Sequence, residues 1–210
     1  MKQFILMADV ISSGEKDQNQ LMIDFKDLVE DINKSYKEKI ISPLTITLGD
    51  EFQGIIVNLE ALVGIVISLE ENIIHKKFNF KLRYVMLEGE IETPINKKIA
   101  YEMLGVGLTD ARYKLNQLKL EKLRFGIFID DKLQNEILKN AFLIFDGITR
   151  KWSLISDYEL VSSFIKFSDY KIIAELMSKT RSQIWKREKT LNIESYNSAK
   201  KIIYLITENK

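Results

Sequence analysis

The sequence predicts an α+β fold in which a split β-α-β sheet is followed by a small all-helical module. Two observations support this prediction. Up to about residue 130, apolar spacing alternates between strand and helix periods in the order strand, helix, strand, strand, helix, strand, followed by one more helix and strand. After Asp157 only the helical period remains. We therefore expect a sheet domain over residues 1–156 and a helical module over residues 157–210.

Each element of the sheet domain follows from its apolar spacing. Residues 4–8 form the short apolar run of a buried strand, and residues 44–48 and 78–87 alternate as strands do. Gly49-Asp50 separates two strand patterns and predicts a tight hairpin. The other expected strands are 52–57 and 123–129, and the expected helices are 17–38, 59–75 and 107–120. This order is ferredoxin-like, with helices expected on one face of the sheet.

The remaining residues are expected to be mostly helical. Residues 131–148 have a helical pattern, and residues 152–155 have the composition of one more short strand. The helix expected at 194–206 is apolar on one face. That face either closes the helical module or forms the contact of a homodimer.

Composition excludes several classes of site. The chain of 210 residues has no Cys and one His, which excludes a disulfide framework, a thiol nucleophile and a Cys-ligated zinc ion. No stretch approaches the roughly 18 apolar residues of a membrane span, so we expect a cytoplasmic protein without a membrane partner. Any metal site must use carboxylates, which favours Mg²⁺, Mn²⁺ or Ca²⁺.

The charge is unevenly distributed along the chain. The formal net charge is +1, from 31 basic and 30 acidic residues. Residues 168–210 alone hold nine basic and five acidic residues, or +4, which leaves −3 for residues 1–167. This segregation indicates two modules with different roles.

Carboxylates gather at one edge of the predicted sheet. Asp9 ends the first strand, and Asp50 and Glu51 lie in the hairpin that should reach the same edge. Clustered carboxylates attract a divalent cation, and the amides of residues 10–14 could cradle a phosphate beside it. The alternative is that these residues only form turns, which favour Asp and Gly.

The motifs at this edge carry a family resemblance. Residues 48–52, LGDEF, resemble the GGDEF signature of diguanylate cyclases, and residues 8–13, ADVISS, resemble the first metal-binding strand of class III nucleotidyl cyclases. Residues 83–91 and 110–112 resemble later cyclase motifs. Taken together, ADVISS, TLGDEFQG, LEGEI and DARYKL match still better the SatD family of bacterial proteins. That resemblance implies a nucleotidyl-cyclase-like, palm-like domain followed by a helix-turn-helix.

The cyclase resemblance also implies roles for individual residues. It implies that Asp9 and Asp50 are ligands of Mg²⁺ or Mn²⁺. Glu51 would be an accessory ligand or an acid/base group, and Arg112 would stabilise charge on phosphate. A nucleotide would lie against three small residues of the adjoining turns, namely Ser12, Ser13 and Gly49.

Three positions depart from the cyclase pattern. Leu48 replaces the first Gly of GGDEF, Val85 replaces a Gly of the later strand, and Leu108 stands where cyclases have an Asn that orients the ribose. These departures favour a degenerate domain that binds a nucleotide or a metal over one that cyclises a nucleotide.

Residues 169–190 have the pattern of a helix-turn-helix. Ser178-Lys179-Thr180 interrupts two helical patterns, and Thr180 is a suitable N-cap for a helix that begins at Arg181. Early residues of such a second helix face base edges, and its later cations reach phosphates. The predicted DNA contacts are Lys179, Arg181, Ser182, Gln183, Lys186, Arg187 and Lys189. The alternative is a basic helical hairpin that packs on the sheet domain or on another subunit.

Three functional hypotheses follow. The leading one is a DNA-binding regulator whose degenerate cyclase-like domain senses a nucleotide or a divalent metal. The alternative is a Mg²⁺- or Mn²⁺-dependent nucleotidyl cyclase, or another nucleotide-processing enzyme, with a regulatory helical module. The third is a scaffold without catalytic activity.

Overall fold

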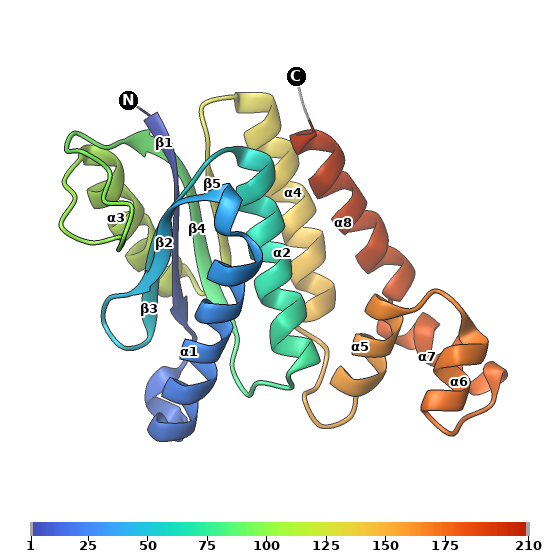
Figure 1. Cartoon of the computed structure of the whole chain (residues 1–210). Helices are drawn as coiled ribbons and strands as arrows, with labels where there is room; N and C mark the ends of the chain where they lie inside the picture. The colour runs from blue at the N-terminus through green and yellow to red at the C-terminus, as the bar shows by residue number, and fades with distance from the viewer. Residues whose placement is uncertain (1, 209–210) are drawn as a thin grey trace.

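A mixed five-stranded sheet forms the centre of the molecule in the computed structural model, which describes residues 2–208 (Figure 1). Its strand order is β2-β3-β1-β4-β5. Central β1 is antiparallel to β3 and β4, and β5 pairs parallel with β4. The predicted split β-α-β order is thereby confirmed. The strands are β1 (Lys2–Val10), β2 (Ile40–Ile46), β3 (Glu51–Ile56), β4 (Leu82–Glu90) and β5 (Phe125–Phe128).

Eight α-helices complete the fold over residues 2–208. Side-chain N-caps fix several of their starts, because an Asp, Asn or Thr oxygen accepts a free amide of the first turn. The helices are α1 (Gln18–Ser35), α2 (Leu59–His75), α3 (Val106–Glu121), α4 (Lys132–Thr149), α5 (Tyr158–Lys166), α6 (Tyr170–Leu176), α7 (Arg181–Leu191) and α8 (Ile193–Thr207).

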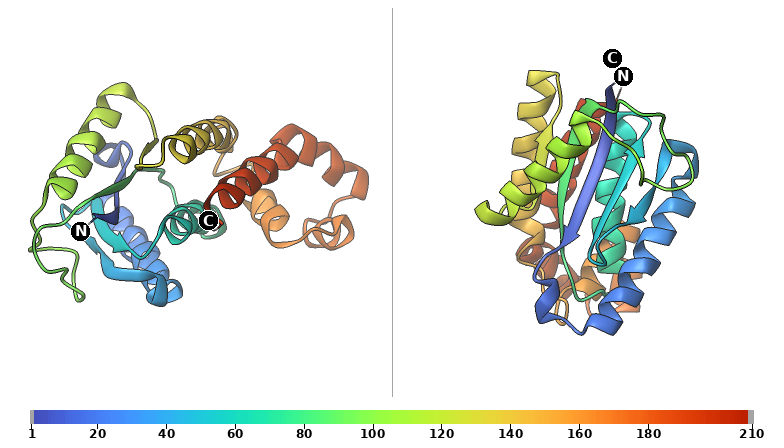
Figure 2. Two further views of the ribbon diagram at one scale, coloured as in Figure 1. Left: turned by 90° about the horizontal axis from the view of Figure 1, so that it is seen from above. Right: turned by 90° about the vertical axis from the view of Figure 1, so that its left-hand side faces the viewer.

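Both faces of the sheet are covered, whereas we expected helices on one face. Helices α1, α2 and α4 lie on one face and α3 lies on the other (Figures 1 and 2). The cause is visible in β1, where Leu6 and Ala8 join the first apolar cluster while Ile5 and Met7 join the second. A strand that is apolar on both sides needs two covering layers.

Two further expectations about strands were wrong. Residues 152–155 form turns, and buried Trp152 serves as a packing residue whose Nε1 donates to the Leu191 carbonyl over 2.9 Å. The strand expected from residue 78 begins only at Leu82. Phe78 and Phe80 precede it, with their rings stacked and their centroids 5.6 Å apart.

Two glycines allow α3 to pack closely on the sheet. A Cβ atom on Gly107 would lie 2.7 Å from the carbonyl carbon of Gly89, which is closer than a carbon atom can approach. The beginning of α3 therefore rests directly on the end of β4. Gly107 has a packing role here, because only a residue without a side chain permits this approach.

The C-terminal helices pack on the helical layer of the sheet domain. Helix α8 packs against α4 and α2, and the Tyr196 hydroxyl donates to Glu71 over 2.7 Å. The apolar face of α8 is buried inside the chain through Tyr196, Ala199 and Ile203. The homodimer and the module boundary at residue 156 stay predictions. Among the described residues, no helix is long and apolar enough to cross a membrane.

Buried Arg124 ties the sheet to two helices. Its guanidinium donates to Glu70 of α2 over 2.6 Å and to Asp146 of α4 over 3.0 Å, and its Nε donates to the Leu82 carbonyl. The Tyr84 hydroxyl also donates to Glu70. Although burial opposes the charge, the pKa of Arg124 stays above its usual value because Glu70 and Tyr84 surround it.

Replacing Arg124 should destabilise the protein strongly. Arg124→Ala leaves the Glu70 and Asp146 carboxylates buried without their main cation, so we expect the free energy of unfolding to fall by about 3–5 kcal/mol. Urea denaturation followed by circular dichroism measures the change. Lys139→Ala removes an exposed ion pair with Glu136 and should change stability by less than about 1 kcal/mol. Similar decreases in both variants would contradict the role of Arg124.

Candidate functional site

Three of the predicted site residues, Asp9, Glu51 and Arg112, meet on the sheet face that α3 covers. Asp9 near the end of β1 lies directly opposite Glu51 of β3 and opposite Arg83 of β4. Residues opposite one another on neighbouring strands point to the same face. The sheet register thus aligns two carboxylates and one guanidinium in a row, and α3 adds Arg112 and Lys119 above that row.

Ion pairs connect these five side chains into one cluster, which we call the Asp9 cluster. Arg83 Nη1 donates to both oxygens of Asp9 over 3.1 and 2.9 Å. Lys119 Nζ lies 3.1 Å from Asp9 Oδ2 and 3.0 Å from Glu51 Oε1, and Arg112 Nη1 donates to Glu51 Oε2 over 2.9 Å. Two carboxylates therefore face three cations.

Burial controls the electrostatics of the Asp9 cluster. Asp9 is 2% exposed, and its burial raises the pKa of its carboxyl group while Arg83 and Lys119 oppose the rise. Burial also opposes the charge of Lys119, but Glu51 and Asp9 hold the pKa of this ammonium above its usual value. The carboxylates and cations therefore stabilise one another's charged forms.

Asp50 and Ser13 form a separate contact at the same edge. The Ser13 hydroxyl donates to Asp50 Oδ2 over 2.5 Å, and the Val10 amide donates to the Asp50 carbonyl over 2.9 Å. Gly49 adopts a φ of 83°, which favours glycine and closes the hairpin. The hairpin is thus fixed to the end of β1, as the sequence suggested.

The contacts of Asp9 do not fit a metal site. A divalent ion at Asp9 would have to displace Arg83 and Lys119 from the oxygens that they already occupy. Across residues 2–208, no group of three or more His, Asp or Glu side chains is placed to hold a metal ion. Metal binding by Asp9 and Asp50, and a nucleotide against Ser12, Ser13 and Gly49, stay predictions.

Sequence reasoning did not assign Arg83 and Lys119 to the site. Arg83 stands in a cyclase-like motif without a predicted role, although a buried Asp at a strand end requires a cation nearby. Lys119 follows Arg112 by seven residues, which places both on one face of α3. That spacing could have indicated that Lys119 joins Arg112 at the site. It could not have indicated which carboxylates the two cations meet, because this depends on the strand register.

The second predicted site lies on α6 and α7, which project from the body of the molecule (Figures 1 and 2). A short turn over residues 177–180 joins them, and Ser178 within it adopts a φ of 51°. Thr180 and Gln183 form a capping box at the start of α7. Ile184 faces the core, whereas Trp185 is 52% exposed.

The seven predicted DNA contacts divide into two groups. Arg187 donates to Asp157 over 2.5 Å, Lys189 donates to Glu194 over 2.8 Å, and Gln183 belongs to the capping box. These three side chains therefore have partners within the chain. The exposed members without a side-chain partner among residues 2–208 are Lys179, Arg181, Ser182 and Lys186.

A family model described as the SatD family matches residues 4–206. The chain belongs to the SatD family. This match confirms the resemblance drawn from the ADVISS, TLGDEFQG, LEGEI and DARYKL motifs. No curated protein matches this SatD-family chain.

Two solved structures are weakly similar to the SatD-family chain, and both are of bacterial light-regulated adenylyl cyclases. One is 10% identical, with a TM-score of 0.47, and the match covers 60% of this chain and 74% of the other. The second is 11% identical, with a TM-score of 0.46, and the match covers 60% and 43%. Similarity at this level carries no argument about activity.

The role of Asp9 can be tested by its removal. Asp9→Ala leaves buried Arg83 without its carboxylate and leaves Lys119 with Glu51 alone, so we expect the free energy of unfolding to fall by about 3 kcal/mol or more. The decrease should be the same in EDTA and in Mg²⁺, because it arises from the ion pairs. Chemical denaturation in both buffers measures it.

Asp27→Ala is the matched control, since it removes an exposed partner of Lys76 and should cost less than about 1 kcal/mol. A wild-type protein that EDTA destabilises to the level of Asp9→Ala would show instead that Asp9 binds a metal.

Proposed function

We propose that this SatD-family chain is a DNA-binding regulator in which α6 and α7 contact DNA and the sheet domain senses a small ligand. One observation carries the proposal, namely the exposed basic α7 behind a four-residue turn. Helix-turn-helix units join two helices through such a turn and place the second helix in the major groove.

The conformation of Ser178 supports a helix-turn-helix. The turn of the motif often contains a glycine, and Ser178 stands at that place in this chain. A φ of 51° is left-handed, and glycine adopts this conformation most readily. Ser178 therefore has the backbone conformation of the expected turn in spite of its side chain.

Some of the predicted DNA-contacting side chains on α7 already have partners within the chain, and this narrows the expected DNA interface to the others. Arg181, Ser182 and Lys186 are exposed, and their side chains have no partner within residues 2–208, so they are available for bases and phosphates. Arg187 instead anchors α7 to Asp157, just ahead of α5. We therefore assign the DNA contacts to Lys179, Arg181, Ser182 and Lys186, and a positioning role to Arg187.

The Asp9 cluster favours sensing over catalysis for the sheet domain. Metal-dependent phosphoryl transfer needs carboxylates that are free to bind cations. Asp9 and Glu51 are each held by cationic side chains of the chain itself. The enzyme hypothesis is tested by incubation of the protein with each nucleoside triphosphate and Mn²⁺. If the wild type turns over a nucleotide and Asp50→Ala does not, the enzyme hypothesis replaces our proposal.

DNA binding should depend on the free cations of α7. We expect the double variant R181Q/K186Q to bind a short duplex more weakly. The slope of log K against log salt concentration should decrease by about 0.9 for each phosphate that the variant no longer neutralises. Fluorescence anisotropy with a labelled duplex at several salt concentrations measures both quantities.

Lys132→Gln is the control, because it removes an exposed charge at the start of α4, at the end of the molecule away from α7 (Figure 1). It should retain wild-type affinity and salt dependence. Undetectable binding by the wild type at low salt would exclude the proposed function.

A further inference from the structure

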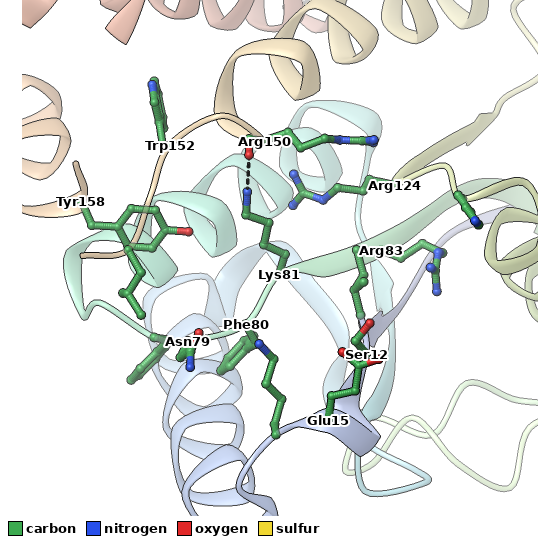
Figure 3. Close-up of a pocket in the computed structure, with 15 residues that line it drawn as sticks. Ser12, Glu15, Asn79, Phe80, Lys81, Arg83, Arg124, Arg150, Trp152 and Tyr158 are labelled. Atoms are coloured by element: carbon green, nitrogen blue, oxygen red, sulfur yellow. Dashed lines mark hydrogen bonds between the residues drawn. The ribbon is translucent and has the colours of Figure 1, made fainter. Parts of the chain in front are cut away.

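A cavity of about 680 Å³ lies where the sheet domain meets the segment that leads into α5 (Figure 3). The turn after β1 and the loop before β4 form one side of it. The end of α4 and residues 150–158 form the other side. Its volume is within the range of small-molecule sites, which is about 300–1,000 Å³.

The lining of the cavity is strongly basic. Glu15 is the one acidic residue that lines it, within the described chain. Asp9 neutralises Arg83, and Glu70 and Asp146 neutralise Arg124. The lining cations are Lys16, Lys81, Arg83, Lys122, Arg124 and Arg150.

Three lysines of the cavity have no carboxylate partner among residues 2–208. Lys16 and Lys122 have no ion pair there, and Lys81 Nζ meets only the carbonyl oxygens of Thr149 and Arg150, over 3.3 and 3.0 Å. Figure 3 shows Lys81 extending toward Arg150, between Tyr158 and Arg124. Carbonyl oxygens satisfy the donors of an ammonium group, but they do not neutralise its charge.

The cost of this uncompensated charge is visible at Lys81. Burial lowers the pKa of this ammonium and the positive charge of Arg124 lowers it further, while Glu70 and Asp146 oppose the decrease only in part. An anion in the cavity would offset the lowered pKa, because it would bring negative charge to a half-buried cation.

Apolar and aromatic side chains also line the cavity. They include Phe80 from the loop before β4, and Trp152, Leu154 and Tyr158 from the other side. The Tyr158 hydroxyl has no hydrogen-bond partner among residues 2–208. Burial, reinforced by Glu70, raises the pKa of Tyr158 to about 12, so this hydroxyl remains a donor at neutral pH.

We propose that this cavity binds an organic phosphate of nucleotide size. Its phosphate groups would lie against Lys81, Lys122 and Lys16, and its planar ring would lie against Phe80 and Tyr158. Phosphate is the anion that several separate cations recognise best, and buried aromatic side chains bind flat apolar rings. The inference rests on the sensing role proposed above. Of the three predicted nucleotide contacts, Ser12 lines this cavity, whereas Ser13 and Gly49 do not.

The position of the cavity gives its occupant a route to α7. Trp152 lines the cavity and donates to the Leu191 carbonyl at the end of α7. Five residues later, Asp157 accepts from Arg187 of α7 and from the Ser153 amide. A ligand that moves residues 150–158 would therefore move the anchors of the proposed DNA-contacting helix.

Tryptophan fluorescence tests the proposal, because the chain has only two tryptophans. Trp185→Phe leaves Trp152 as a single reporter in the cavity. ATP, GTP and sodium pyrophosphate are titrated separately into this variant without DNA or metal. We expect at least one nucleotide to change the Trp152 emission with saturation, and to bind more tightly than pyrophosphate, which lacks a ring.

Charge variants in the Trp185→Phe background locate the phosphate contacts. Lys81→Gln and Lys122→Asn should each weaken nucleotide binding about tenfold or more, as expected when a charge-assisted hydrogen bond is removed. Lys122 is exposed and adopts a φ of 57°, which Asn tolerates, so this variant should fold normally. Lys139→Gln, far from the cavity lining, should bind as the parent does.

Three results would overturn the proposal: no change in emission with any probe, equal binding of pyrophosphate and nucleotides, or unchanged affinity in both lysine variants. Since DNA is absent from these titrations, nucleotide binding and DNA binding by α7 can fail independently.

Discussion

The fold depends on the compensation of charge in its interior, above all at Arg124. This guanidinium is almost fully buried immediately before β5, and it contacts a carbonyl at the start of β4, a carboxylate of α2 and a carboxylate of α4. Burying the guanidinium without carboxylate partners would cost a large amount of free energy. The contacts of Arg124 therefore require β4, α2 and α4 to meet in this one arrangement. That arrangement also places the end of α4, and with it the basic cavity, against the sheet.

The same constraint explains the Asp9 cluster on the opposite face. Asp9 at the end of β1 and Glu51 at the start of β3 are surrounded by the cations Arg83, Lys119 and Arg112. Cationic side chains thus take the positions around the carboxylates that a divalent ion would need. The cluster holds α3 to the sheet, as the close packing of its first turn also does.

Residues 150–158 connect the two halves of the molecule. They line the basic cavity on one side and hold α7 through Trp152 and Asp157 on the other. One apolar core extends from the sheet through α5 to Ile173 and Ile184 of the projecting helices. A change at the cavity would therefore reach α7 through packed structure, as the proposed regulatory role requires.

The sequence by itself determined the element order as far as α4, because helical and strand periods are local properties of the chain. It also determined the hairpin at Gly49 and the capped start of α7 at Thr180, since both follow from the conformations that these residues favour. It did not reveal that α3 covers the second face, although the uninterrupted apolar run of β1 contained that information. Only the tertiary structure decided which cations Asp9 meets and where Lys81 lies without an acidic partner. Those facts depend on strand register and on contacts between residues far apart in the chain, and no local pattern encodes them.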